Sequence, residues 1–387
     1  MNELLIHPIT PAVPPAAAQA TAIKIEQMET TLVPLKKQNF LRLALQDQIL
    51  FAKRLSILVR AGVPILKSLQ MMQTQARTKS GSKIFAKIVF DVENGQFLST
   101  SLSQFKKIFS EFMVNLVQVG EISGNLHENL NYLADELSKK QALRRKIVNA
   151  MVYPALIITA TLGIIVMLTV YLFPKILPIF SSFKFKLPLS TKILIVASDV
   201  MIHYGLYILL GLIVFGVIYA LSLRNRKFKT FTHRMILAIP IVGTIARSYH
   251  LTNICRTLSI LLKSGVTINR GIHITAKTST NFLFQDNLVA MADSVNKGEM
   301  ISTHMLKTPK LYPAILVQMV AVGESAGNLT ETLAYLSEMY ENEVDDQTKN
   351  LSTALEPILM ISMGVIVGFI AISIITPIYQ ITQYLKP

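Results

Sequence analysis

Three long apolar stretches without a charged residue dominate the pattern of the chain. They are 153–173, 205–223 and 357–379, which contain 21, 19 and 23 residues. A helix of about 20 apolar residues crosses the hydrocarbon core of a bilayer. Each stretch therefore predicts a transmembrane helix, and tyrosines near the ends, such as Tyr153 and Tyr379, suit the headgroup region.

Between these stretches the apolar residues recur with helical spacing. Runs at i, i+3, i+4 and i+7 occur in 50–58, 84–92 and 112–119. Gly62, followed by Val63-Pro64, predicts one helix end and the next helix start, and Gly95 predicts another end. Ser99 is placed to cap the helix after Gly95. We expect about six helices in each bundle and no sheet.

The second half of the chain repeats the first at a constant offset of 203 residues. LSILVRAGVPI at 55–65 corresponds to LSILLKSGVTI at 258–268, with seven identities in eleven positions. GEISGNLHENLNYL, from Gly120, corresponds to GESAGNLTETLAYL, from Gly323, with nine identities in fourteen. One offset without a gap over this distance indicates an internal duplication.

The repeat and the spans together predict an all-α, multi-pass membrane protein with two repeated cytoplasmic six-helix bundles and three transmembrane helices. Each copy is followed by an exit span, so the middle span has to return the chain. The expected segments are a Pro/Ala-rich tail (1–36), bundle 1 (37–150), span 1 (151–173), an extracytoplasmic loop (174–204), span 2 (205–223), bundle 2 (224–356), span 3 (357–379) and an extracytoplasmic tail (380–387).

Composition and charge agree with this organisation. Of the 387 residues 51% are hydrophobic and only 16% charged, and the net charge is +15. The flanks 139–152 and 224–235 hold ten Lys and Arg, whereas 174–203 and the tail from 380 hold five. Excess cations mark the cytoplasmic side, so we expect both bundles and the N-terminus in the cytoplasm. The basic residues suit a lipid surface better than nucleic acid, for which no reading motif is present.

The sharpest motif is the duplicated Gly-Glu-x-x-Gly-Asn-Leu segment. Two interpretations stand side by side: a tight turn between helices, in which Gly supplies a positive φ and Asn caps the next helix, and a docking surface with exposed glutamates. The first interpretation is the commoner use of a loop glycine. The candidate docking residues are Gly120, Glu121, Gly124, Asn125, Gly323, Glu324, Gly327 and Asn328.

Other features of the spans and the stems before them suggest movement or association. Pro154 and Pro357 lie at the start of the exit spans, as ordinary prolines or as hinges. Gly364 and Gly368 form a GxxxG motif, a candidate for helix packing in a dimer. The stem at 139–146 is basic and its repeat at 341–346 is acidic, so the two could pair within a chain or between chains.

The search for catalytic chemistry yields no candidate. Cys255 is the only cysteine, the seven histidines show no ligand spacing, and no phosphate-binding Gly-rich loop is present, so we expect no metal, no cofactor and no enzyme activity. The spans lack Asp, Glu, His, Lys and Arg, which counts against a coupled transporter. A small transporter with regulatory domains stays open as an alternative, and a membrane-bound enzyme ranks last.

The arrangement of domain, span, span, domain and span, with paired LSILxxxGVxI and GExxGNL segments, resembles the inner-membrane platform proteins of type IV pilus assembly and type II secretion. The resemblance covers roughly 38–383 and is nearer to the pilus branch in the final span. It implies a non-enzymatic platform that docks a hexameric assembly ATPase and couples its motion to pilin or pseudopilin subunits. It also implies other inner-membrane machine components as partners and a homo-oligomer, with a dimer expected. Whether the machine extends, retracts, imports or exports is open.

Overall fold

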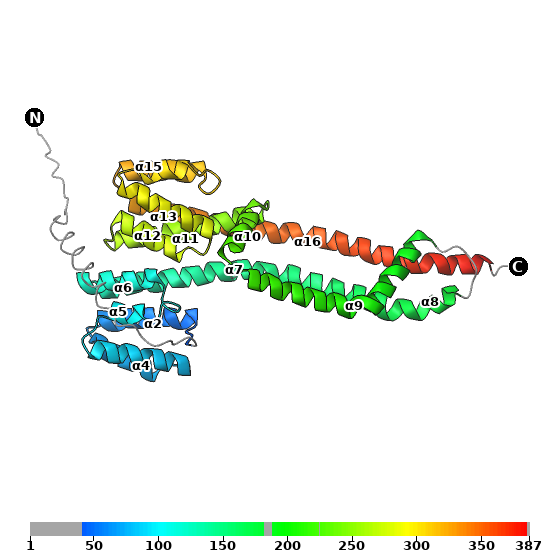
Figure 1. The fold of residues 1–387 in the computed structure, drawn as a ribbon, viewed down its shortest axis with the longest axis horizontal. Helices are drawn as coiled ribbons and strands as arrows, with labels where there is room; N and C mark the ends of the chain where they lie inside the picture. Colours follow the sequence, from blue (N-terminus) through cyan, green and yellow to red (C-terminus); the bar gives the residue numbers. More distant parts are fainter. Residues whose placement is uncertain (1–40, 182–187, 224, 385–387) are drawn as a thin grey trace, which may run out of the picture. The chain divides into compact units, whose positions relative to one another are not determined.

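The computed structural model describes residues 41–181, 188–223 and 225–384, and all of its regular elements are helices within that part of the chain. The predicted tail at 1–36 lies outside the described residues. Within the described part the all-α expectation is confirmed, and the helices fall into two bundles and a set of long apolar helices (Figure 1).

Each repeat forms six helices, as predicted. The first copy consists of α2 (Leu45–Arg60), α3 (Ile65–Thr74), α4 (Lys79–Glu93), α5 (Leu98–Ser103), α6 (Glu111–Ser123) and the start of α7 (Leu126–Val166). The second consists of α11 (Val242–Lys263), α12 (Ile268–Thr278), α13 (Phe282–Asn296), α14 (Ile301–Leu306), α15 (Ala314–Ser325) and the start of α16 (Leu329–Tyr384). The 203-residue offset therefore relates the helices of the two copies as well as their sequences.

Local backbone chemistry ends these helices where the sequence indicated. The positive-φ glycines form three pairs at the repeat offset: Gly62 and Gly265, Gly95 and Gly298, Gly124 and Gly327. After Gly62, the N–H of Val63 bonds to the carbonyl of Leu58, the backbone pattern that closes a helix on a left-handed residue. A duplicated side-chain bond repeats too, because Ser56 Oγ donates to His127 O at 2.6 Å and Ser259 Oγ to Thr330 O at 2.8 Å.

The described chain separates into two compact units. The first comprises residues up to Ala142 together with His250–Met339, and so contains both copies of the bundle. The second comprises Leu143–Tyr249 and the chain from Tyr340 onward. In the first unit, Leu261, Val266 and Ile274 of the second copy belong to the same buried cluster as the core of the first copy. Part of the second copy therefore packs into the core of the first.

The second unit holds the apolar helices. Beyond α7 the chain forms the π-helical turn η1 (Met167–Leu172), α8 (Phe173–Ser181), α9 (Leu189–Ser222) and α10 (Arg226–Ala238). Three helical segments are long and apolar enough to cross a membrane, namely Leu126–Ile176, Leu189–Ser222 and Leu329–Pro377. They contain the first predicted span and nearly all of the other two, so this chain is a membrane protein. The bent pair of α10 and α11 also passes a test of length and composition.

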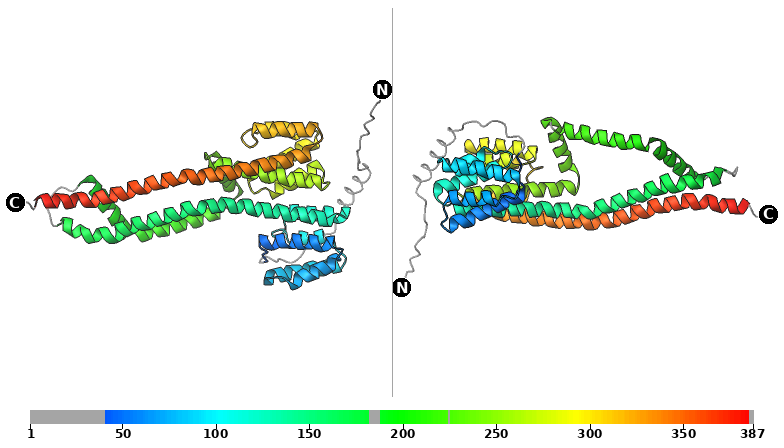
Figure 2. Two further views of the ribbon diagram at one scale, coloured as in Figure 1. Left: turned by 180° about the vertical axis from the view of Figure 1, so that it is seen from behind. Right: turned by 90° about the horizontal axis from the view of Figure 1, so that it is seen from below.

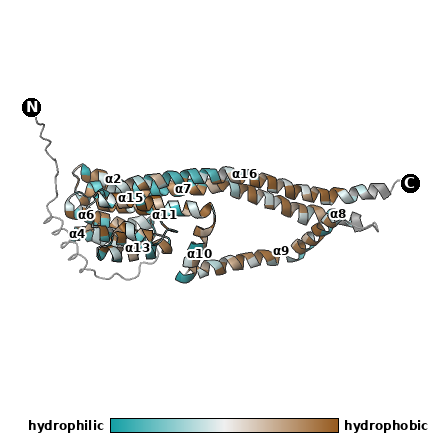
Figure 3. Cartoon of the chain, turned by 90° about the horizontal axis from the view of Figure 1, so that it is seen from above, coloured by the Kyte–Doolittle hydropathy of each residue, from teal (hydrophilic) through white to brown (hydrophobic). Residues whose placement is uncertain are grey.

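The region expected to be a loop at 174–204 is largely helical in its described part. Helix α8 occupies its start, and α9 begins at Leu189 directly after Pro188. The charged residues Lys192 and Asp199 ended the apolar run in the sequence, but they do not stop a helix. Phe173, Leu194 and Ile370 form a small core where α8, α9 and α16 meet. Figure 2 (right) and Figure 3 show the C-terminal half of α9 running apart from α7 and α16.

Candidate functional site

The duplicated Gly-Glu segments lie at the corresponding helix junctions of the two copies. Residues 120–126 join α6 to α7, and residues 323–329 join α15 to α16. Gly124 has a φ of 77° and Gly327 a φ of 70°, values that side chains other than glycine rarely adopt. Both residues end a helix, so the tight-turn interpretation of the second glycine describes the geometry.

The first glycine of each segment allows a close approach of two helices. A Cβ on Gly120 would lie 2.9 Å from Cα of Leu126, and a Cβ on Gly323 would lie 2.4 Å from Oγ1 of Thr332. Real Cβ atoms do not come so near to other heavy atoms. The helix before the turn therefore packs directly against the first turn of the helix after it, which only glycine permits at this position.

The glutamate of each segment caps a short helix in its own bundle. Glu121 accepts the backbone N–H groups of Leu98 at 2.6 Å and Ser99 at 2.9 Å, at the first turn of α5. Glu324 accepts the N–H groups of Ile301 at 2.7 Å and Ser302 at 3.2 Å, at the first turn of α14. A carboxylate at a helix N-terminus satisfies donors that have no partner inside the helix.

This geometry differs from the interpretation in which the two glutamates are exposed on a docking surface. Both glutamates are half-buried, and burial raises the pKa of Glu121 above its ordinary value, although the bonds from Ser99 and Leu98 lower it. The prediction that Ser99 caps its helix is wrong, because α5 begins at Leu98 with Phe97 at the N-cap position. Ser99 lies inside the helix, and the capping group comes from a residue 22 positions later. The docking role of the segments stays a prediction.

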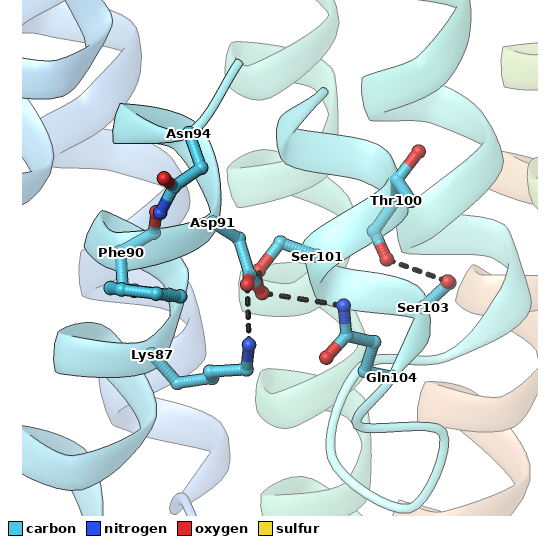
Figure 4. A network of polar contacts seen from close by, with 8 residues as sticks. All are labelled: Lys87, Phe90, Asp91, Asn94, Thr100, Ser101, Ser103 and Gln104. Atoms are coloured by element: carbon cyan, nitrogen blue, oxygen red, sulfur yellow. Dashed lines mark hydrogen bonds and ion pairs between the residues drawn. The ribbon is translucent and has the colours of Figure 1, made fainter. Parts of the chain in front are cut away.

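The buried carboxylate of Asp91 also bonds to the short helix α5. Figure 4 shows Lys87 and Gln104 converging on Asp91 of α4, which is only 1% exposed. Ser101 Oγ of α5 donates to Asp91 Oδ2 at 2.7 Å. In the second copy the equivalent positions hold Ser294 and His304, whose Oγ and Nδ1 lie 3.1 Å apart. Burial lowers the pKa of His304, so the imidazole there is neutral at neutral pH.

Polar contacts join the two copies within the first unit. Arg270 of α12 donates from Nη2 to Asn115 Oδ1 at 2.9 Å and to Gln118 Oε1 at 3.1 Å, both on α6. Lys277 and Glu111 form an ion pair at 2.6 Å. These contacts tie α6 of one copy to α12 of the other. The residue of the first copy that is equivalent to Arg270 is Lys67.

A second contact between the copies is buried. Arg256 Nε of α11 lies 3.5 Å from Glu136 Oε2 of α7, and the two side chains are 6% and 4% exposed. A buried charge requires an opposite partner because water cannot solvate it. Beside these contacts lies a cavity of about 680 Å³ between α5, α6 and α7 of one copy and α11 and α12 of the other. Lys106, Lys140 and His273 line it along with Arg270.

The two prolines predicted as hinges lie inside continuous helices. α7 runs through Pro154 and α16 runs through Pro357 without interruption. Proline removes a backbone donor and weakens the helix around it, so a hinge at these residues stays a prediction. The π-helical turn η1 lies further along the first exit span, just before Pro174.

A second pair of prolines, which the sequence reading did not single out, is tied to α9. Pro174 and Pro377 are equivalent at the 203-residue offset. In η1 the N–H of Phe173 bonds to the carbonyl of Leu168, five residues earlier, and Pro174 has no N–H to give to the next carbonyl, that of Thr169. Ser198 Oγ of α9 donates to this Thr169 carbonyl at 2.7 Å in a buried position.

The same arrangement occurs on the last span. Pro377 cannot donate to the carbonyl of Ser373, four residues before it. Thr191 Oγ of α9 donates to that carbonyl at 2.8 Å, again in a buried position. Two hydroxyl groups of one helix therefore complete the backbone hydrogen bonding of two exit spans at repeat-related prolines. Water is absent from a bilayer core, so such a carbonyl needs a partner from the protein.

The GxxxG motif takes no part in packing between the described helices of this chain. A Cβ on Gly364 or on Gly368 would meet no described atom within 4 Å. The motif is therefore available for contact with another chain, and its role in a dimer stays a prediction.

The oppositely charged stems pair within the chain at one point. Lys146 of α7 and Asp345 of α16 form an ion pair in the second unit. Leu143, Val344 and Ile245 pack together beside it. The basic stem of the first copy and the acidic stem of the second therefore form an ion pair within one chain. Among the described residues no group of three or more His, Cys, Asp or Glu is arranged to hold a metal ion.

Comparison with known proteins agrees with the duplicated architecture. Residues 51–174 and 254–377 each match the family model of type II secretion system (T2SS) protein F. The chain is 32% identical to the type IV pilus assembly protein PilC of Thermus thermophilus, over 87% of this chain and 83% of that protein. It is 31% identical to the type IV pilus assembly protein TapC of Aeromonas hydrophila, over 87% and 81% of the two chains. It is 30% identical to the type II secretion system protein F of Aeromonas hydrophila, over 86% of each chain. The two matched segments begin and end 203 residues apart, at the offset of the repeat, and the chain belongs to the type II secretion system protein F family.

Proposed function

We propose that this protein is a non-enzymatic inner-membrane platform of a type IV pilus assembly machine. The observation that carries the proposal is the double family match, which falls on the two structural repeats and includes both exit spans. Relatives named as type IV pilus assembly proteins cover most of the chain, and they support the pilus machine over its alternative. The alternative is the equivalent platform of type II secretion, to which the similarity is almost as high.

The partner we propose is a hexameric assembly ATPase on the cytoplasmic side. The charge bias of the flanks supports a cytoplasmic position for both bundles and the N-terminus. The exposed part of each Gly-Glu segment, Gly124 with Asn125 and Gly327 with Asn328, is the candidate contact. The glutamates act indirectly in this proposal, because they hold α5 and α14 in place beside the turns.

The structure supports a passive transmission of movement. The buried pair of Arg256 and Glu136, together with the bonds of Arg270, joins the copies, so a force on one bundle reaches the other. From the bundles, α7 and α16 continue as unbroken helices of 41 and 56 residues toward the apolar segments. Pilin or pseudopilin subunits and other inner-membrane components are the proposed recipients of that movement.

The test is a binding and hydrolysis assay with the full chain in mild detergent and each candidate assembly ATPase of its genome. We expect stoichiometric binding and a changed rate of ATP hydrolysis with a pilus ATPase. Asn125→Arg and Asn328→Arg change exposed residues of the turns. Gln70→Arg, at an exposed position of α3, is the matched control.

Three results of this assay are informative. Binding that is lost in the two turn variants and kept in the control supports docking at the segments. Binding that survives in all variants keeps the platform and leaves the segments as helix turns. Binding only to a secretion ATPase selects the type II alternative, and no binding to any such ATPase overturns the platform proposal.

A further inference from the structure

Helix α10 follows the second apolar helix almost at once. α9 ends at Ser222 and α10 begins at Arg226, so three residues separate them. Three residues span at most about 11 Å. Because α9 crosses the bilayer, α10 has to begin at the surface of that bilayer, on the side with the higher density of cations.

The sequence of α10 divides into two faces. Phe228, Phe231 and Met235 fall within an arc of about 60° on a helix with 3.6 residues per turn. Arg226 and Lys229 point to the opposite side, and Lys227 and Arg234 lie on one flank of the apolar arc, beside Phe231. A basic face opposite an aromatic and apolar one is the pattern of a helix that lies in a membrane interface.

The apolar face is largely uncovered in the described part of the protein, where Phe228 alone of its three residues is partly buried. None of the thirteen residues of α10 is buried, and Phe231 and Met235 are 57% and 54% exposed. The exposed apolar surface continues past the helix through Ile239, Ile241 and Val242. A helix that packs on a protein core buries its apolar stripe, so this stripe is adapted to another apolar medium.

Aromatic contacts connect the stripe to the lipid-facing surface of α9. The rings of Phe228 and Tyr219 meet edge to face with centroids 5.9 Å apart, and Tyr219 stacks with Phe215 at 6.5 Å. Phe215 is 68% exposed on the apolar helix. The row of rings leads from the side of the span onto the apolar face of α10, which makes the two surfaces continuous. This continuity favours bilayer lipid over another protein as the occupant.

α10 meets both of its neighbouring helices at sharp turns. At its start it turns sharply from α9, as Figure 2 (right) and Figure 3 show. At its end it meets α11 at a bend of 110°. Ile241 in that corner has a φ of 68°, an outlier for a β-branched residue. A Cβ on Gly243 would lie 2.4 Å from the carbonyl oxygen of Leu237, so only glycine fits at this corner.

We propose that α10 is an interfacial helix whose Phe228, Phe231 and Met235 enter the bilayer that α9 crosses, while its arginines and lysines bind anionic lipid headgroups. A transmembrane path through α10 and α11 is disfavoured, because four cations within thirteen residues would have to enter the hydrocarbon core. The helix anchors the start of the second bundle copy to the membrane surface and reads the charge of the lipid there.

The test places single fluorophores on the full-length protein in nanodiscs. Met235→Cys labels the apolar face and Thr230→Cys labels the polar face of the same helix. The native Cys255 does not compete for label, because it is buried and burial raises the pKa of its thiol to about 12. Quenching is measured with spin-labelled lipids, either phosphatidylglycerol or phosphatidylcholine, at equal mole fraction.

We expect the label at 235 to be quenched at least twofold more than the label at 230. We also expect spin-labelled phosphatidylglycerol to quench at least twofold more than phosphatidylcholine. The triple variant Lys227→Gln, Lys229→Gln, Arg234→Gln should lose the preference for the anionic lipid. The control variant Lys79→Gln, Lys83→Gln, Lys107→Gln removes three exposed cations from the first bundle and should keep it.

Three results would contradict the proposal. Equal quenching at both positions would mean that α10 does not lie with one face in the bilayer. A label at 235 that neither lipid nor an aqueous quencher reaches would mean that protein, such as a second copy of this chain, covers the stripe. Quenching at 235 without any lipid preference in the wild-type sequence would refute the headgroup role of the cations.

Discussion

The hydroxyl groups of α9 offer a sharp test of how the membrane helices hold together. Thr191 donates to the Ser373 carbonyl that Pro377 leaves without a helical donor, at 2.8 Å. Thr191→Val keeps the shape and volume of the side chain and removes the donor alone. We expect this variant to lose stability for one reason, the orphaned carbonyl.

The magnitude follows from the burial of the bond. Thr191 and Ser373 are both 0% exposed, so no water can replace the hydroxyl. Leaving a buried acceptor without a partner costs about 1–3 kcal/mol, and hydrogen bonds between membrane helices average about 0.6 kcal/mol with a maximum of about 1.7. We therefore expect Thr191→Val to lower the free energy of unfolding by about 1–2 kcal/mol, which for a chain of 387 residues corresponds to roughly 1–2.5 °C in the midpoint of thermal unfolding.

The assay is thermal or denaturant unfolding of the purified full chain in one detergent. Thr159→Val is the matched control, because Thr159 Oγ also donates to a backbone carbonyl, that of Ala155, at 2.7 Å. Its position is exposed and the helical N–H of residue 159 already serves that carbonyl, so the hydroxyl is redundant. The control should change the free energy of unfolding by less than about 0.5 kcal/mol.

A double-mutant cycle with the proline decides the mechanism. Pro377→Ala restores a backbone N–H four residues after Ser373, so the carbonyl regains a helical donor. In that background Thr191→Val should cost little, which gives a coupling energy of about 1 kcal/mol. An equal cost in both backgrounds, or a cost no larger than that of Thr159→Val, would refute the argument that the hydroxyl compensates for the proline.

Three further predictions concern the bundles and stems. Burial raises the pKa of Glu121, so the native state binds the proton more tightly than the unfolded chain does, and the contribution of Glu121 to stability falls as pH rises from its unfolded pKa to its folded pKa. In pH-resolved denaturation Glu121→Gln should remove this dependence, and Glu121→Ala should cost about 1–2 kcal/mol through the lost cap. Gly120→Ala should cost about 1–3 kcal/mol in the same measurement, because its Cβ would meet Leu126 at 2.9 Å. Gly364→Ala should not destabilise the chain, and a similar cost for both variants would contradict the close packing of α6 on α7 at Gly120. Lys146→Asp should lose about 0.2–1 kcal/mol, and adding Asp345→Lys should recover it unless the ion pair contributes nothing.

The sequence by itself determined the spans, the duplication and most helix ends of this protein. These features depend on chemistry within a few residues: an uncharged run long enough for a bilayer, a helical period, and a glycine that accepts a left-handed φ as Gly62 and Gly124 do. The constant offset needs only a comparison of the chain with itself. The same local signals placed a cap at Ser99, which is wrong because the capping group comes from a distant residue. They began the second apolar segment at Gly205, whereas α9 begins at Leu189, across residues of mixed polarity.

The tertiary structure alone decided which groups meet. Glu121 reaches a helix start 22 residues earlier, and Thr191 meets a carbonyl 182 residues away. No periodicity encodes these separations, because they follow from how helices pack after they form. The same holds for α10: its two faces are visible in the sequence, but only the structure shows that the described residues bury none of its side chains fully. Local sterics determine which residues form helices, and long-range packing determines which of these helices meet.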